Sequence, residues 1–368
     1  MSARFLLACL LLAAPFTAYA LDISGFRFDA RQFDPSKGEQ ATVRFVLSAP
    51  ATVELRVWDG RDLLIRTISS GRSLPAGENA LVWDGRDSKG RPVPAEAYRV
   101  TLQATGIDGQ TVHHDLSDTT GGQTLTVDKV NWDADAGVVR YRLPKPARVN
   151  LRAGMQNDGP LLRTIIDWVP RPSGEQAEAW DGWDASRVLD LRHHPKLQVS
   201  VDAFALSENT LLVGPPPSQV QLITDLTADT PRRERAAIRR KLMHEHSQQS
   251  LEERGDVAIT LTLPANLPRD KVGVPLASGL VPIRLDVADK DRQRMLDRRI
   301  EPVFFVDGTF AFENEVGFLP TTWIWNTETA NEGEHYISAN VRGYEGNFGM
   351  ATIKVRVVRA PAKAKGSQ

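Results

Sequence analysis

Aspartate side chains are the first candidates for chemistry, because grouped carboxylates can bind calcium or act as acids and bases. They gather at three places: Asp84 with Asp87, Asp133 with Asp135, and Asp286 with Asp289 and Asp291. A calcium loop supplies about six to eight oxygen ligands, and each cluster lacks the acidic residue that closes an EF-hand loop. Aspartate is also a preferred turn residue, because its side chain accepts hydrogen bonds from nearby backbone N–H groups. We therefore interpret the clusters as turns, with calcium binding as the alternative.

Histidine spacing does not favour a metal site. The candidates are the adjacent pairs His113–His114 and His193–His194, and His244 with His246. Neighbouring residues of a strand point to opposite faces, and metal-binding histidines on a helix stand one turn apart. The sequence also lacks Gly-x-Ser-x-Gly, His-Glu-x-x-His and a phosphate-binding glycine loop. We predict no enzyme activity, no metal and no cofactor; two carboxylates brought together by the fold, as in glycosidases, are the alternative.

Two features could contact a partner. Trp323 and Trp325 are two residues apart and share one face of a predicted strand. Core packing is the interpretation that we favour, and a platform that stacks on a sugar or a protein is the alternative. The second feature is a basic run in a predicted helix, made of Arg232, Arg233, Arg235, Arg239, Arg240 and Lys241. We interpret this helix as a solvated connection, with contact to an anionic partner as the alternative.

An internal repeat organises the first part of the chain. Residues 44–56 and 140–152 both alternate apolar and polar side chains, break at a proline and resume the alternation. That pattern is typical of two strands joined by a turn. Residues 64–68 are answered by residues 161–165, and the Trp-Asp-Gly motif at 83–85 is answered at 180–182. The repeat length of about 97 residues predicts a duplicated domain, because one immunoglobulin-like sandwich takes about 100 residues.

The Trp-Asp-Gly motif has a structural interpretation. Trp83 ends a predicted strand and offers a large apolar surface to a core. Asp84 can cap backbone N–H groups, and Gly85 can adopt a positive φ without a Cβ clash. Asp87 and Gly90 predict a second turn. The equivalent residues of the second copy are Trp180, Asp181 and Gly182.

The first copy resembles a known family. Residues 33–35 with Gly38, the strand at 51–57, the motif at 83–87 with Gly90, and Tyr98 together resemble the immunoglobulin-like domain of flagellar hook-capping proteins. The resemblance covers residues 21–106 and, more loosely, 108–213, and it implies immunoglobulin-like sandwiches. Glu96 stands where such modules usually have glycine, and the second copy has Leu197 near the tyrosine position. The resemblance implies no flagellar role, because hook-capping proteins lack a secretory signal.

The remainder of the chain predicts a linker and a third sandwich. Residues 214–217 read Gly-Pro-Pro-Pro, and a helix-start signal follows at 229–231. Alternating runs return at 257–263, 281–287, 302–306, 335–341 and 351–357, with a hairpin signal at 307–308. Residues 305–308, 323–327, 333–335 and 346–347 together resemble another exported bacterial immunoglobulin-like module.

The N-terminus predicts export. One arginine, an apolar run at residues 5–16 and small residues before Leu21 are typical of a secretory signal peptide cleaved after Ala20. Lipidation at Cys9 is the alternative. No other stretch is apolar and long enough to span a membrane. The net charge of −1 over 368 residues argues against general nucleic-acid binding. We expect a periplasmic or extracellular protein.

Together these patterns predict an all-β protein of tandem immunoglobulin-like sandwiches joined by a Pro-rich and helical linker. The expected parts are a signal peptide (1–20), module 1 (21–107), module 2 (108–213), the linker (214–256), module 3 (257–358) and a tail (359–368). We expect a non-catalytic exported structural or adaptor protein that docks envelope or extracellular proteins through edge strands and loops. A carbohydrate- or cell-wall-binding surface protein is the second hypothesis, and an enzyme with a non-local site is the third.

Overall fold

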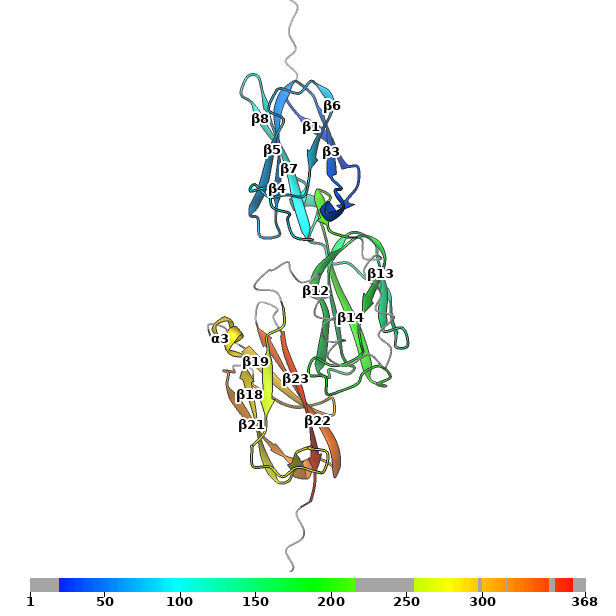
Figure 1. The fold of residues 1–368 in the computed structure, drawn as a ribbon, viewed down its shortest axis with the longest axis vertical. Coiled ribbons are helices and arrows are strands. Elements are labelled where there is room, and N and C mark those ends of the chain that lie inside the picture. The colour runs from blue at the N-terminus through cyan, green and yellow to red at the C-terminus, as the bar shows by residue number, and fades with distance from the viewer. Residues whose placement is uncertain (1–19, 216–254, 297–299, 315–316, 344–347, 360–368) are drawn as a thin grey trace, which may run out of the picture.

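The computed structural model describes residues 20–215, 255–296, 300–314, 317–343 and 348–359. Within these ranges nearly every element is a strand, and the strands form three sandwiches placed along one long axis (Figure 1). The predicted all-β class with tandem sandwiches is confirmed. Residues 1–19 of the predicted signal peptide, residues 216–254 of the predicted linker, and residues 360–368 of the predicted tail lie outside the described residues. No described helix is long and apolar enough to cross a bilayer.

The first sandwich packs a three-stranded sheet against a larger one. The first sheet has the order β1 (Ile23–Phe28), β3 (Ala41–Leu47), β6 (Gly77–Trp83). The second has the order β2 (Gln32–Phe33), β15 (Thr210–Val213), β7 (Ala97–Gly106), β4 (Ala51–Trp58), β5 (Leu64–Ser69), with β8 (Thr111–His114) also on β7. A short 3-10 helix, η1 (Pro35–Lys37), follows β2. Strands β3 and β4 bury every second residue, as the alternation at 44–56 predicts.

The second sandwich repeats this order with fewer strands. One sheet is β9 (Asp128–Asp133), β10 (Val138–Leu143), β13 (Gly174–Ala179), and the other is β12 (Leu161–Arg171), β11 (Ala147–Met155), β14 (Leu197–Ala205). With β2, β8 and β15 set aside, the two sandwiches have the same strand order in both sheets. A one-turn helix, α1 (Ser117–Thr120), connects them.

The third sandwich has one sheet of three strands and one of five. The first has the order β16 (Ile259–Thr262), β18 (Leu280–Val287), β21 (Thr321–Asn326), and the second β17 (Leu276–Ala277), β23 (Phe348–Val357), β22 (Gly333–Gly343), β19 (Ile300–Val306), β20 (Thr309–Glu313). Helix α3 (Asp289–Leu296) follows β18, and the 3-10 helix η3 (Thr327–Thr329) follows β21. The hairpin predicted at 307–308 joins β19 to β20. Each of the three sandwiches has its own cluster of buried apolar residues.

Strand pairing crosses both boundaries that the sequence suggested for the second module. The expected boundary between residues 107 and 108 runs between β7 and β8, which pair in one sheet. Strand β15, at the end of the expected second module, pairs with β7 and β2 of the first sandwich. Its residues Leu211 and Val213 belong to the core of the first sandwich. The chain therefore leaves the first sandwich, builds the second, and returns to complete the first.

Candidate interaction surfaces

The two Trp-Asp-Gly motifs lie in the sandwich cores rather than at a binding surface. Trp83 is fully buried and its Nε1 donates to the Arg86 carbonyl at 3.0 Å. Trp180 is buried in the same way and donates to the Trp183 carbonyl at 3.1 Å. The aspartates Asp84 and Asp181 accept the backbone N–H two residues further on. Gly85 and Gly182 adopt φ of 71° and 73°. Both motifs thus orient a buried ring and reverse the chain.

The second turn uses one aspartate in each copy. Asp87 accepts backbone N–H groups of Lys89 and Arg91, both at 2.9 Å, beside Gly90 at φ 74°. In the second copy Asp184 is 1% exposed and accepts the N–H groups of Val188 and Leu189 at 2.7 and 2.9 Å. Asp184 was not among the turn residues predicted from the sequence. Its position 97 residues after Asp87 was the signal that could have identified it.

The two tryptophans proposed as a partner contact have different environments. Trp325 is 3% exposed and belongs to the core of the third sandwich. Trp323 is half-buried and packs against Phe304 and Phe312, with ring centroids 5.2 and 6.3 Å away. These two tryptophans therefore do not form an exposed pair of rings. The other proposed contact, Arg232 to Lys241, lies outside the described residues.

The aspartate clusters make local hydrogen bonds and ion pairs. Asp133 accepts the Ala136 N–H at 2.9 Å, as expected of a turn residue. Asp286 contacts Arg284 at 2.9 Å and Arg292 at 3.4 Å. Among the described residues, no three histidine, cysteine or acidic side chains are grouped so that they could hold a metal ion.

The joint between the first and second sandwiches is built on β15. Asn209 is fully buried; its Nδ2 donates to the Val100 carbonyl at 2.9 Å and to Asp115 Oδ1 at 2.8 Å. At the other end of β15, where the Glu96 carbonyl accepts the Val213 N–H, Glu96 of the first sandwich forms an ion pair with Arg148 of the second at 2.8 Å, with both side chains largely buried. The side chain at position 96, unusual for the family that the first copy resembles, therefore connects two sandwiches.

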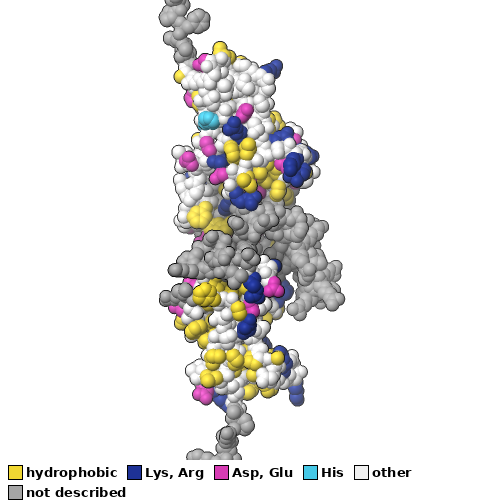
Figure 2. All heavy atoms as spheres, turned by 90° about the vertical axis from the view of Figure 1, so that its left-hand side faces the viewer, with side chains coloured by type: hydrophobic (Ala, Val, Ile, Leu, Met, Phe, Trp, Pro, Cys, Tyr) yellow, Lys and Arg dark blue, Asp and Glu magenta, His cyan; other side chains and the backbone are white. Residues whose placement is uncertain are grey.

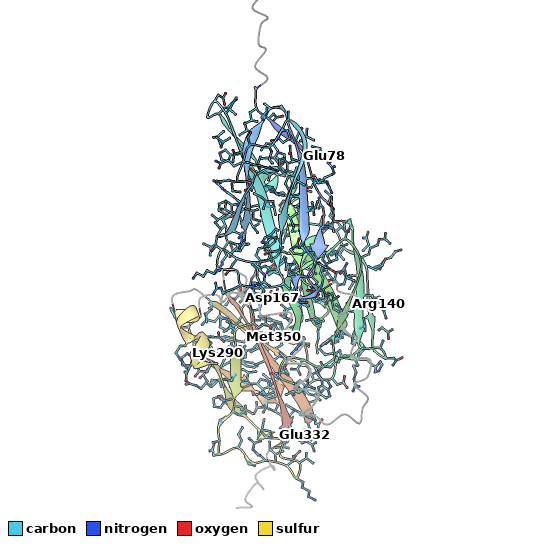
Figure 3. All side chains as sticks on the ribbon, turned by 45° about the horizontal axis from the view of Figure 1, so that its top comes forward. Glu78, Arg140, Asp167, Lys290, Glu332 and Met350 are labelled. Carbon is cyan, nitrogen blue, oxygen red and sulfur yellow. The ribbon has the colours of Figure 1, made fainter. Side chains whose placement is uncertain are left out.

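The joint between the second and third sandwiches is polar and well hydrogen-bonded. The Asn340 amide pairs with both backbone groups of Leu161, at 2.8 and 2.7 Å. Thr164 donates to Asp256 Oδ1 at 2.9 Å, and the Gly255 N–H donates to Asp167 Oδ2 at 2.8 Å. Figure 3 labels Asp167, which lies where the two sandwiches meet. These contacts hold the start of the third sandwich against β12.

Burial dominates the electrostatics of this joint. The pKa of the Asp256 carboxyl is raised to about 6; burial is the largest cause, and the nearby Asp167 carboxylate acts in the same direction. The Thr164 hydrogen bond and the charges of Arg152 and Arg163 act in the opposite direction. Burial also lowers the pKa of both arginines. The joint therefore contains four ionisable groups in a poorly solvated space.

The edge of the third sandwich exposes aromatic side chains. Phe310, Phe312 and Ile324 are 53%, 39% and 51% exposed on the edge strands β20 and β21. Figure 2 shows hydrophobic side chains gathered on one face of this sandwich. The pairing of β20 with β19 shifts register between Phe304 and Phe305, which leaves Ala311 as a bulge. A bulge protects an edge strand against pairing with another strand. This edge therefore exposes its side chains and does not favour backbone pairing with a further strand.

An open groove lies on the second sandwich, between the edges of its two sheets. It has a volume of about 450 Å³ and is lined by Val130, Trp132, Arg192, His193, His194, Leu197 and Val199. Trp132 packs on Trp180 with ring centroids 4.7 Å apart and donates to the Arg192 carbonyl at 3.1 Å. Partial burial lowers the pKa of His194, and the charge of Lys196 lowers it further. The groove is therefore lined by apolar side chains of β9 and β14 and by the polar side chains of residues 192–194.

Comparison with known proteins places the family likeness on the first sandwich. Residues 30–108 match the family model of the FlgD Ig-like domain. That match covers less than half of the chain, so the likeness of the second and third sandwiches to such modules stays a prediction. No similar sequence is found among curated proteins.

Three of the solved structures that this chain resembles are distant in sequence. FlgD from P. aeruginosa is 23% identical, with 24% of this chain and 67% of that chain covered and a TM-score of 0.21. The fibronectin(III)-like modules of Clostridium thermocellum CbhA are 12% identical, with 93% and 99% covered and a TM-score of 0.21. A 1.5-MDa bacterial ice-binding adhesin is 12% identical, with 93% and 99% covered and a TM-score of 0.18. None of these likenesses carries an argument about function.

Proposed function

We propose that this chain is a non-catalytic, exported structural or adaptor protein that docks envelope or surface proteins through its immunoglobulin-like sandwiches. The observation that carries the proposal is the coupling of the three sandwiches. Strand β15 joins the second sandwich to the first, and hydrogen bonds of Asn340, Asp256 and Asp167 join the third to the second. Coupled sandwiches hold their edges and loops at fixed spacings, as a scaffold for partners requires.

Two further observations support this proposal. The match of residues 30–108 to the FlgD Ig-like domain fits a module of exported proteins. Export through a signal peptide cleaved after Ala20 is part of the proposal. The burial of Trp325 removes one ring of the tryptophan platform on which a carbohydrate-binding function would rest.

Site-specific photocrosslinking in the native envelope tests the proposed function. A photoreactive residue would replace exposed edge residues, such as Ile324 or Gln198, one at a time in the full chain. We expect adducts with a small, reproducible set of envelope proteins, and an excess of unlabelled chain should compete them away. Absence of protein adducts at every position, combined with binding of the pure chain to peptidoglycan or hydrolysis of a glycan panel, would contradict the proposal.

A further inference from the structure

The first sandwich accepts a strand that comes from outside its own stretch of sequence. Strand β15 pairs antiparallel with the start of β7, where Leu211 lies opposite Tyr98. The Val100 N–H donates to the Asn209 carbonyl at 2.8 Å, and the Val213 N–H donates to the Glu96 carbonyl at 2.9 Å. The side chains of Leu211 and Val213 enter the core. The start of the β7 edge is thus covered by backbone pairing and by two apolar side chains.

The equivalent edge of the second sandwich is β14. In the first sandwich Val57 of β4 lies opposite Val100, and in the second Ala153 of β11 lies opposite Val199. With β4 and β11 aligned through the repeat, Val199 is equivalent to Val100 and Leu197 to Tyr98. Residues 122–125 cover only the far end of β14, where the Leu125 N–H donates to the Ala203 carbonyl at 2.8 Å. Within the described ranges, no strand pairs with the outer edge of β14 from residue 197 to 201.

The groove of the second sandwich lies beside this open edge. Leu197 and Val199 form one wall of the groove, and Val130 and Trp132 form the other. In the first sandwich the ring of Phe33, on β2, packs on Trp83 with centroids 5.5 Å apart, next to β15. The second sandwich has no counterpart of β2, because residues 134–137 lead directly from β9 to β10. The groove is therefore the space that β2 and β15 occupy in the first sandwich.

We propose that the β14 edge and this groove form a strand-acceptor site for an extended segment of a partner protein. The proposal rests on the proposed adaptor function and states how a partner docks. As in β15, the segment would pair through its backbone and place two apolar side chains, two residues apart, in the groove. Lys196 is exposed beside the groove, so an acidic residue next to the apolar pair is favoured.

Among the described residues, the neighbouring sandwiches leave this edge accessible. Strand β14 is one edge of its sheet and β12 is the other. The third sandwich docks on β12, where Asp167 accepts the Gly255 N–H and Leu161 pairs with Asn340. The third sandwich therefore lies against the edge opposite the proposed site.

A peptide-binding measurement on the full chain tests this site. The probe is a fluorescent synthetic peptide with the sequence of residues 207–214, which includes β15. A matched control peptide has the same sequence with aspartate at the positions of Leu211 and Val213. Fluorescence anisotropy should show saturable binding of the first peptide and at least about tenfold weaker binding of the second, because two buried apolar side chains are lost.

Two variants of the chain test whether the peptide binds at β14. Val199→Pro removes the N–H that faces the open edge and leaves the β11–β14 ladder intact, because proline is tolerated at an edge. Val130→Asp puts a charge in the groove wall. Each should weaken peptide binding about tenfold or more. The matched control Val82→Asp changes a 45% exposed valine of the first sandwich and should leave binding unchanged. Circular dichroism would establish that each variant is folded.

The outcomes separate this inference from the proposed function. Absence of saturable binding, or equal binding to wild type and to folded Val130→Asp, would overturn the strand-acceptor site. Concentration-dependent dimers that Val199→Pro abolishes would show a second copy as the occupant, contrary to the proposal. If envelope partners crosslink equally to wild type and Val199→Pro, the adaptor function stands and the strand-acceptor site fails. If wild type captures no protein partner at any position and the pure chain instead binds peptidoglycan or hydrolyses a glycan, the adaptor function fails.

Discussion

The stability of the joint between the second and third sandwiches should depend on pH through one carboxyl group. Burial raises the pKa of Asp256 from 3.8 to about 6. Asp167, Arg152, Arg163 and the Thr164 hydroxyl also act on it. Asp256→Asn keeps the side-chain shape and an acceptor for Thr164, and it removes the ionisable group. The pH dependence lost in this variant is therefore the contribution of Asp256.

The expected magnitude comes from the two pKa values. Because the pKa is higher in the folded state, folding favours the protonated carboxyl. Its stabilising contribution is complete below pH 3.8 and is lost as the pH rises to about 6. The difference between the two values corresponds to about 3 kcal/mol. Relative to Asp256→Asn, the wild-type free energy of unfolding should fall by about this amount over that pH range.

Urea unfolding of the full chain from acidic to neutral pH, followed by tryptophan fluorescence, measures this difference. The matched control is Asp118→Asn, which changes an exposed aspartate of α1 and should give the wild-type profile. Parallel profiles for wild type and Asp256→Asn would refute the argument. So would a variant less stable than wild type at neutral pH, since Asp256 would then be acting as the ionised partner of Arg152 and Arg163.

Three further predictions test the cores and the first joint. Arg171→Met should lower the free energy of unfolding by about 3–5 kcal/mol, because it leaves Glu178 buried without the arginine 2.6 Å away. The double variant Arg171→Met with Glu178→Met should restore much of the lost stability. Calorimetry on both variants checks this. Gly85→Ala should lower the melting temperature more than Gly182→Ala does. Both substitutions strain a positive φ, but a Cβ at 85 meets the rigid Pro35 ring at 2.3 Å, whereas a Cβ at 182 meets the flexible Arg192 side chain. Equal shifts in melting temperature would contradict this. Glu96→Ala should leave the first sandwich folded but speed hydrogen exchange at the Val213 N–H, because Arg148 loses its partner at the joint. Unchanged exchange at Val213 would count against a role of this ion pair in holding β15.

Local pattern in the sequence predicted the strands and turns well. The alternation at residues 44–56 became β3 and β4, with alternate side chains buried. The Trp-Asp-Gly motifs became buried rings beside glycines at positive φ. These features depend on neighbouring residues, so a short stretch of sequence contains the information that they need.

Features that depend on distant segments could not be predicted in the same way. The apolar run at 211–213 indicates a strand, but nothing local shows that it pairs with β7, more than a hundred residues earlier. The sequence places Trp323 and Trp325 on one face, but their unequal burial depends on how β20 packs beside them. The groove is a gap in the pairing of β14, and a gap has no sequence pattern of its own.

Departures from the repeat and from the family pattern gather where the sandwiches have different neighbours. Glu96 replaces a glycine expected from the family, and it is the residue that pairs with Arg148 across the first joint. Leu197 stands at the tyrosine position of the second copy, and it borders the groove where β15 has no counterpart. The two copies keep the same core motif and differ at their edges. The proposed strand-acceptor site therefore lies where the two copies differ, because the cores are shared and the edges are not.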